Sequence, residues 1–265
     1  LFSIKTDQQV FQSRNVIVAT GSKSFPTTGS TGDGIQFAKK FDIKYNEFSP
    51  AETSVYSNEI VKKHGDLQGI ALKNVEVNVL NTKHKYTGDL LFTHYGLSGP
   101  AIYHLSEFIY FAIKDGNNKL SFNLSSLNSE SFVTFLTQKR EGTDFLRKAL
   151  EEVMQKRVVK KVLEITKINN VKVSSLSTKQ MDSIIKIVNE FTIKIDHTEL
   201  LKKAYVNKGG ILTNELNPKS FESKKVKGLY FIGETTDIHG PIGGYNITIA
   251  FASGVAAARS IAMKQ

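Results

Sequence analysis

The feature that most constrains the fold is a strand, a glycine-rich loop and a helix in direct succession near the end of the chain. The apolar run GLYFIGE, which begins at residue 228, predicts a buried strand, and TTDIHGPIGG predicts a loop. The helix expected next, YNITIAFASGVAAARSIA, consists mainly of small and apolar residues and can lie close to a sheet. Such a unit presents unpaired backbone N–H groups at the helix N-terminus, where an anion binds favourably.

A second glycine-rich loop follows a second apolar run. The run VIVA at 16–19 predicts a strand buried on both faces of a parallel or mixed sheet, and residues 21–34 carry four glycines. Two such loops favour an extended ligand such as a dinucleotide, although either loop alone also fits a tight strand–helix connection without a ligand. Glu234 and Asp237 follow the later strand and can accept hydrogen bonds from sugar hydroxyls. The common fingerprint G-x-G-x-x-G is absent, because GSTGDG at 29–34 has the spacing G-x-x-G-x-G.

The rest of the sequence changes periodicity along its length. Short alternating stretches between residues 51 and 125 predict strands, and from about 128 to 190 the apolar spacing is that of helices. We therefore expect an α+β protein with one domain built from two separate segments and a β-rich lobe inserted between them. The expected bounds are 1–50 and 210–265 for the domain, 51–209 for the lobe, and 128–190 for its helical part.

Composition excludes several classes of protein. The 265 residues are 40% hydrophobic and 23% charged, which is typical of a globular chain rather than a disordered one. The absence of cysteine excludes disulfides, thiolate metal sites and a cysteine nucleophile, and it suits a cytoplasmic protein. No apolar run reaches the roughly 18–20 residues of a membrane helix, so we expect no membrane association. We also expect no metal site, because no two of the histidines stand at metal-ligand spacing.

The excess of basic residues raises the question of nucleic-acid binding. The formal net charge is +10, but the lysines and arginines are scattered. The densest stretch, KRVVKK at 156–161, places its basic side chains on one side of a helix, where they could bind phosphate. A solvated face opposite the valines explains the pattern more simply. The scattered distribution of the basic residues therefore argues against nucleic acid as the partner, whereas the net charge alone favours it.

Four motifs in order resemble those of a known family. VIVATGSKSFPTTGSTGDG, LLFTHYGLSGPAI, VNKGGILTNELNPKSFESK and GLYFIGETTDIHGPIGGYNITIAFASG are similar to the successive motifs of the HI0933-like family of FAD-dependent flavoproteins. The resemblance covers essentially the whole chain. It implies a Rossmann-derived FAD domain interrupted by a β-rich lobe with a helical insertion. It also implies that the family's first strand–GxGxxG–helix is missing, so that we expect an incomplete FAD domain.

The resemblance assigns roles to particular residues. Residues of the first loop would lie along the cofactor, those after the last strand would lie near the ribityl chain and pyrophosphate, and the start of the last helix would place N–H groups beside flavin N1 and O2. The residues concerned are Thr20, Gly21, Ser22, Gly233, Glu234, Gly243, Gly244, Tyr245, Asn246 and Ile247. The sequence departs from the family at Ser22, where glycine is usual, near His239, where an acidic residue is usual, and at Thr248, where glutamine is usual. The last two departures leave the surroundings of the flavin open.

His94 is the candidate catalytic residue. It lies within FTHYGLSGP, and histidine titrates near neutral pH, so it can transfer protons or contact substrate. A histidine that only braces the loop before Pro100 is the alternative.

The resulting hypothesis is an FAD-dependent oxidoreductase that transfers hydride between flavin and a small organic substrate, with NAD(P)H or oxygen as a candidate partner. Without the first segment, we expect this chain to be inactive and to purify without colour. The alternative is a flavoprotein-derived module that binds RNA without redox turnover, for which only the charge speaks.

Overall fold

The computed structural model describes residues 1–264 and divides into two compact units. Unit 1 comprises Leu1–Thr53 and the chain from Glu199 onward, and unit 2 comprises Ser54–Thr198. The sequence interpretation placed the second boundary after residue 209. The structure places it earlier because β12 (Val206–Ile211) pairs with β4 (Tyr45–Ala51) of unit 1.

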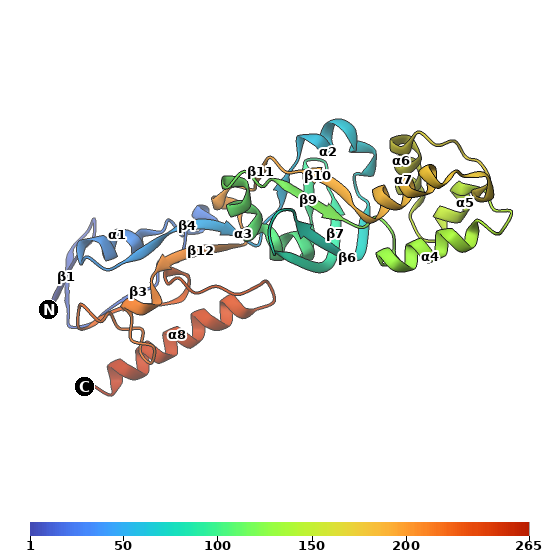
Figure 1. Ribbon diagram of the computed structural model, residues 1–265. Helices are drawn as coiled ribbons and strands as arrows, with labels where there is room; N and C mark the ends of the chain where they lie inside the picture. The colour runs from blue at the N-terminus through green and yellow to red at the C-terminus, as the bar shows by residue number, and fades with distance from the viewer. Residues whose placement is uncertain (265) are drawn as a thin grey trace. The chain divides into compact units, whose positions relative to one another are not determined.

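Unit 1 contains three two-stranded sheets among its described residues (Figure 1). In two of them the strands are antiparallel: β1 (Phe2–Lys5) with β2 (Val10–Ser13), and β4 with β12. In the third, β3 (Val16–Val18) is parallel to β13 (Leu229–Phe231). Because parallel strands end at the same edge, the loops that follow β3 and β13 start side by side.

Each of those loops leads into a helix. The first loop contains the short 3-10 helix η1 (Pro26–Thr28) and ends at α1 (Asp33–Lys40), while the second contains η6 (Gly233–Thr235) and ends at α8 (Tyr245–Ala262). The N-caps of α1 and α8, Gly32 and Gly244, both have positive φ, which glycine adopts without strain. The remaining 3-10 helices of unit 1 are η4 (Leu201–Lys203) and η5 (Thr213–Glu215).

The expectation that β3 is buried on both faces is wrong. Val18 is buried, but Ile17 is 43% exposed and Ala19 is also exposed. Alternate residues of a strand point to opposite faces, so the face that carries Ile17 and Ala19 is not covered by the described residues. The apolar run correctly predicts a strand. Burial of that strand depends on neighbouring segments, which the run itself does not specify.

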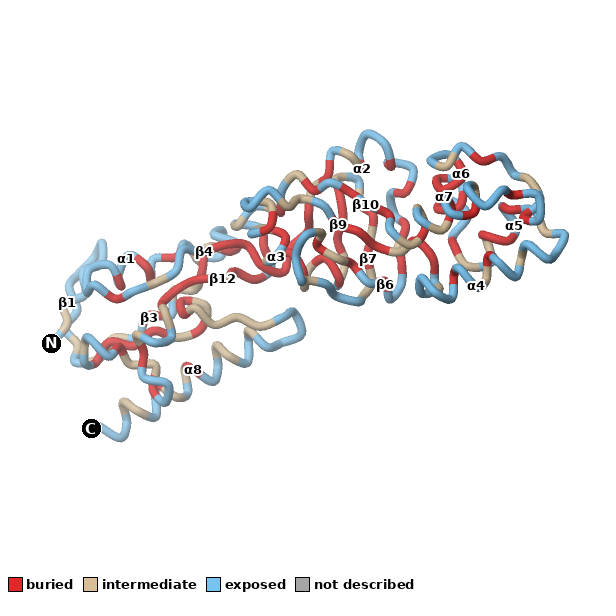
Figure 2. Tube along the Cα trace, in the orientation of Figure 1, coloured by how far each residue is buried: buried red, intermediate tan, exposed pale blue. Residues whose placement is uncertain are grey.

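Unit 2 is built on one seven-stranded sheet in which every pairing is antiparallel. Its strand order is β10-β9-β6-β7-β8-β5-β11. Most of the buried apolar residues in these strands belong to one continuous core. Figure 2 colours the buried positions red along the Cα trace. The bounds are Val55–Tyr56 (β5), Ala71–Val79 (β6), Lys85–Phe92 (β7), Gly96–Ser98 (β8), Lys119–Phe122 (β9), Phe191–Lys194 (β10) and His197–Thr198 (β11).

Two groups of helices complete unit 2. One group lies within the β-rich part: α2 (Asn58–Lys63), η2 (Gly65–Leu67) and α3 (Pro100–Lys114), whose first residue is the proline expected to start a helix. The other group falls in the interval 128–190 and gathers at one end of unit 2 in Figure 1. It consists of α4 (Ser129–Lys139), α5 (Leu146–Glu151), α6 (Lys156–Thr166), η3 (Val173–Ser175) and α7 (Thr178–Asn189). A capping box between Ser177 and Gln180 begins α7.

The basic stretch of α6 is only in part the solvated face that the sequence suggested, because Lys156, Arg157 and Lys160 are exposed but Lys161 is not. Lys161 is only 3% exposed, and its Nζ lies 3.0 Å from carboxylate oxygens of both Asp66 and Glu164. The Arg157 guanidinium donates to the carbonyl oxygens of Asp66 and Gln68. Two of the four basic side chains therefore hold α6 to the 66–68 turn and are not available to phosphate.

Candidate functional site

The two glycine-rich loops are joined at the carboxyl ends of β3 and β13. The Gly21 N–H donates to Thr235 Oγ1 at 3.2 Å, and the buried Ser22 hydroxyl donates to Glu234 Oε2 at 2.9 Å. These residues are more than 200 positions apart in the chain. The structure therefore brings together Gly21, Ser22 and Glu234, which the sequence singled out for one cofactor.

Thr20, the residue before this junction, has a polar atom without a partner. Its Oγ1 is buried and forms no hydrogen bond within the described part of the chain. The nearby Gly34 leaves little room, because a Cβ at that position would lie 3.1 Å from Thr20 Oγ1 and 2.3 Å from Thr235 Cγ2. An unsatisfied hydroxyl at the edge of a ligand loop is a natural hydrogen-bonding group for a bound cofactor.

The loop after β13 is fixed to the helix that it precedes. The Gly233 N–H donates to Ser253 Oγ at 2.9 Å, and Ser253 is buried on α8. Sequence reasoning noted Ser253 only as a small residue, and it missed Thr235. A hydroxyl on the buried face of a helix, facing the turn that precedes that helix, is the signal that identifies such a residue.

Asp237 is used by the protein itself. Its Oδ2 accepts from Asn46 Nδ2 at 2.7 Å, and its Oδ1 accepts from the Gly209 N–H at 3.1 Å. The carboxylate therefore ties the loop after β13 to β4 and β12. Its expected role toward sugar hydroxyls stays a prediction.

The N-terminus of α8 is open. No side chain caps it, and Gly243 and Gly244 before it have φ values of 136° and 92°. A Cβ on Gly244 would meet nothing within 4 Å, which places its backbone beside open space. The unpaired N–H groups of this 18-residue helix carry the positive end of its dipole. They form the strongest anion-attracting feature of the second loop.

Asn246 braces that loop. Its side-chain amide accepts from the Gly240 N–H at 2.9 Å and donates to the Gly240 carbonyl at 2.7 Å. The oxygen and the nitrogen of this amide both bond to the main chain of Gly240, so Asn246 stabilises the shape of the loop. Tyr245 and Ile247 point outward and are 59% and 65% exposed.

His94 lies in unit 2, in the turn between β7 and β8. Its side chain is exposed and makes an edge-to-face contact with Tyr95 at 4.8 Å between ring centroids. The Tyr95 ring stacks on Tyr56, and Tyr56 stacks on His197. The imidazole is therefore available to solutes, and its catalytic role stays a prediction.

Comparison with known protein families decides the class. The family model described as the HI0933-like protein Rossmann domain matches residues 1–260. The chain belongs to the HI0933-like family. The resemblance inferred from the motifs is thus confirmed, as is the α+β fold with a Rossmann-type domain.

Three curated relatives of this HI0933-like chain carry two kinds of name. Two are called ribosomal RNA dihydrouridine synthase: the Escherichia coli K12 protein, 28% identical over 266 residues, and the Haemophilus influenzae protein, 29% identical over 262 residues. A third, from Clostridium scindens, is called 3-dehydro-bile acid delta(4,6)-reductase and is 28% identical over 272 residues. Each match covers 98% of this chain but only 64%, 63% and 65%, respectively, of the relative. The chain thus spans slightly less than two thirds of the length of these relatives.

The residues present fit the FAD that the family binds. An open helix N-terminus suits an anionic edge of a cofactor, and the unsatisfied Thr20 hydroxyl offers it a hydrogen bond. Residues 1–264 contain no cluster of acidic or histidine side chains that could hold a metal ion. Over the same residues, none of the helices combines the length and hydropathy needed to cross a bilayer.

Proposed function

We propose that this chain is the main part of an FAD-dependent reductase that saturates a carbon–carbon double bond conjugated to a carbonyl group. The names of the relatives support this reaction class. Making dihydrouridine requires saturation of the uracil 5,6 double bond, which is conjugated to the C4 carbonyl. A delta(4,6)-reductase of a 3-dehydro bile acid acts on double bonds conjugated to a 3-oxo group. The two substrates differ in size and charge, but the reacting group is the same.

The observations that carry the proposal are the junction of the two loops and the open N-terminus of α8, the helix into which the second loop leads. FAD, when bound and reduced, supplies the hydride. The N–H groups at the start of α8 would stabilise negative charge on a bound flavin, because they carry the positive end of the helix dipole. The Gly21–Thr235 and Ser22–Glu234 hydrogen bonds hold the two loops to each other.

His94 is the proposed proton donor. Saturation places a hydride on the carbon β to the carbonyl and a proton on the α carbon, so the substrate needs one acid. His94 is exposed, lies in a short turn between two strands, and can reprotonate from solvent.

RNA is the substrate class that the charge favours. The chain carries a formal charge of +10, which attracts a polyanion such as RNA. The same charge does not distinguish an anionic steroid from other small anions. The alternative, RNA binding without turnover, shares this feature and lacks only the reduction step.

The complete reading frame that contains these 265 residues is the material for the test. The purified protein is assayed for FAD content, for reduction of uridine in a ribosomal RNA transcript, and for reduction of a 3-oxo-4,6-diene steroid. We expect bound FAD and loss of the uracil 5,6 double bond, with RNA affinity that falls steeply with salt. Salt-sensitive RNA binding without FAD would favour the binding module, and activity on the steroid alone would reassign the substrate.

The role of His94 is tested in the same protein. His94→Ala should lower turnover by about a hundredfold or more, the effect of losing a general acid, while FAD content stays unchanged. His84→Ala provides the control, because His84 is a half-buried histidine of unit 2 that stacks on Phe108. Loss of flavin together with activity would make His94 a cofactor-binding or structural residue.

A further inference from the structure

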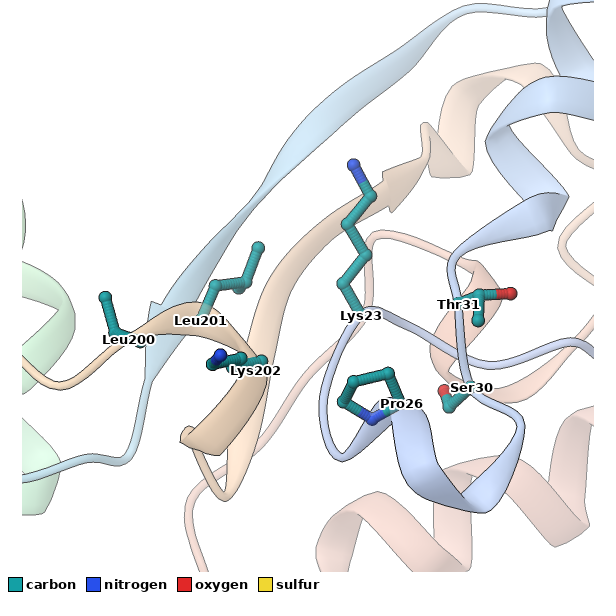
Figure 3. A pocket seen from close by; sticks show the side chains of 7 residues that line it. All are labelled: Lys23, Pro26, Ser30, Thr31, Leu200, Leu201 and Lys202. Atoms are coloured by element: carbon teal, nitrogen blue, oxygen red, sulfur yellow. The ribbon is translucent and has the colours of Figure 1, made fainter.

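A pocket of about 440 Å³ lies in unit 1 between the first glycine-rich loop and η4. Figure 3 shows Leu200, Leu201 and Lys202 on one side, Pro26, Ser30 and Thr31 on the other, and Lys23 between them. The size falls within the usual range of small-molecule sites. None of its lining residues belongs to the set that the family resemblance assigned to FAD.

The walls of this pocket are fixed to each other. The Lys23 N–H donates to Asn207 Oδ1 at 3.2 Å, the Ser24 hydroxyl donates to the Ala204 carbonyl, and the Phe25 N–H donates to the Lys202 carbonyl at 3.0 Å. Phe25 has a φ of 46° and a ψ of 61°, a left-handed conformation that is rare and strained for a bulky residue. The surrounding hydrogen bonds hold the strained conformation, and the loop keeps its shape.

Both lysines of the pocket have free ammonium groups. Neither Lys23 nor Lys202 forms a side-chain ion pair within residues 1–264, in contrast to Lys225 and Lys264 of the same unit, which pair with carboxylates. The Lys23 stem lies against Gly32, where a Cβ would come within 2.7 Å of its Cγ. Gly32 therefore gives the Lys23 stem the room to lie there. Two unpaired cations beside one cavity attract a phosphate group.

The remaining wall is apolar. Pro26 and Leu201 line it, and Leu200 is 57% exposed although its side chain is aliphatic. An exposed leucine next to lysines suits a ligand that combines a flat apolar ring with negative charge. The hydroxyl of Thr31 is already donated to Asp33 Oδ2, so the polar selectivity of the pocket rests mainly on the lysines.

We propose that this pocket binds a phosphorylated nucleotide, with its phosphate at Lys23 and Lys202 and its base against Pro26 and the two leucines. An open pocket of about 440 Å³ has the size for one nucleotide, whereas an RNA strand is held along an extended basic surface. Two sources share this chemistry, the ADP half of FAD and the phosphorylated adenosine of a nicotinamide dinucleotide. Binding itself does not depend on the proposed reductase activity; only a role as hydride donor rests on it.

The test is isothermal titration of the 265-residue chain with 2′,5′-ADP, which carries the adenosine and phosphates of NADPH without its reactive ring. Lys23→Met and Lys202→Met keep the aliphatic stems and remove the charges. Each should raise the Kd about tenfold, and the double variant about a hundredfold, as expected for a charge-assisted phosphate contact. Lys203→Met is the matched control, because Lys203 is the next residue of η4 and does not line the pocket. Circular dichroism and the thermal midpoint check that each variant is folded.

A second pair of titrations tests the apolar wall and the source. Leu200→Ala should weaken the binding of 2′,5′-ADP by several-fold and leave the affinity for inorganic pyrophosphate unchanged. If the lysine variants also bind FAD more weakly, the pocket holds the ADP half of FAD. If only their affinity for NADPH falls, the pocket holds the dinucleotide donor. Equal affinity of the parent and double variant for 2′,5′-ADP overturns the proposal, as does a parent that binds an RNA oligonucleotide through these lysines but no free nucleotide.

Discussion

The two units differ in how completely each buries its own apolar side chains. Unit 2 has one continuous core that runs from Val55 to Ile195 and joins the sheet to the helices. The buried apolar cluster of unit 1 is small, and α8 buries only Ser253 and Ala257 of its 18 residues. The apolar residues Ile247, Phe251 and Val255 recur every four positions on α8 and are 65%, 73% and 48% exposed.

The difference shows where each unit obtains its stability. Burial of apolar surface contributes about 25 cal/mol per Å², so the core of unit 2 is a large favourable term. In unit 1, hydrogen bonds between loops and close fits at glycines carry more of the organisation. We therefore expect unit 2 to tolerate changes in the loops and unit 1 to be sensitive to them.

The largest expected effect is in the core of unit 2. Phe122 is 1% exposed and contacts Phe92 and Phe191 edge to face, so Phe122→Ala should lower the free energy of unfolding by about 3–5 kcal/mol. Phe251→Ala removes the same side chain from α8, where it is exposed, and should change stability by no more than about 0.5 kcal/mol. Urea unfolding followed by circular dichroism measures both. A comparable loss in Phe251→Ala would break the comparison.

A glycine of unit 1 should give the next largest effect. Gly210 has a φ of 114°, and a Cβ there would lie 2.6 Å from the Thr235 carbonyl oxygen. Gly210→Ala should lower the free energy of unfolding by about 3 kcal/mol, since it combines backbone strain with a steric clash. Gly29→Ala is the matched control, because Gly29 has a φ of 93° but nothing within 4 Å of the added Cβ, so only the strain of about 1 kcal/mol applies. Hydrogen exchange of β4 and β12 reports the difference, and equal costs would show that the close fit is unimportant.

The smallest effect expected is a pH dependence in unit 2. Burial lowers the pKa of His64 from its ordinary 6.5, and the charge of Lys161 adds to this, while Glu59 and Asp66 oppose it and Lys63 assists. Because the folded state holds the neutral form, the unfolded state binds more protons as pH falls below about 6.5. Stability is therefore full above that pH and decreases as pH falls toward the lowered pKa of the folded protein.

The dependence is limited to about 1.4 kcal/mol per pH unit for one proton. Urea midpoints between pH 5 and 8 measure it, and His64→Leu should flatten that part of the profile. A stability that rises on acidification, or an unchanged profile in His64→Leu, would exclude His64 as its source.

Part of the candidate site was predictable because it is encoded locally. Glycines that follow a short apolar run specify a strand–loop–helix wherever they occur, so the loops at 16–34 and 228–262 could be placed from the residues alone. The contacts between them could not. The partners Gly21 and Thr235 are more than 200 positions apart, and no local pattern of either residue names the other.

The sequence by itself determined many of the elements: the helices of the interval 128–190, the strands between residues 51 and 125, and the proline at which α3 begins. These follow from the period of apolar residues and from backbone preferences, which act over a few positions. Only the tertiary structure decided burial and partnership. Lys161 can be buried because two carboxylates pair with its ammonium group, and Ile17 is exposed because none of the described residues covers its face of β3. Whether a side chain is covered depends on segments distant in sequence, which periodicity along the chain cannot encode.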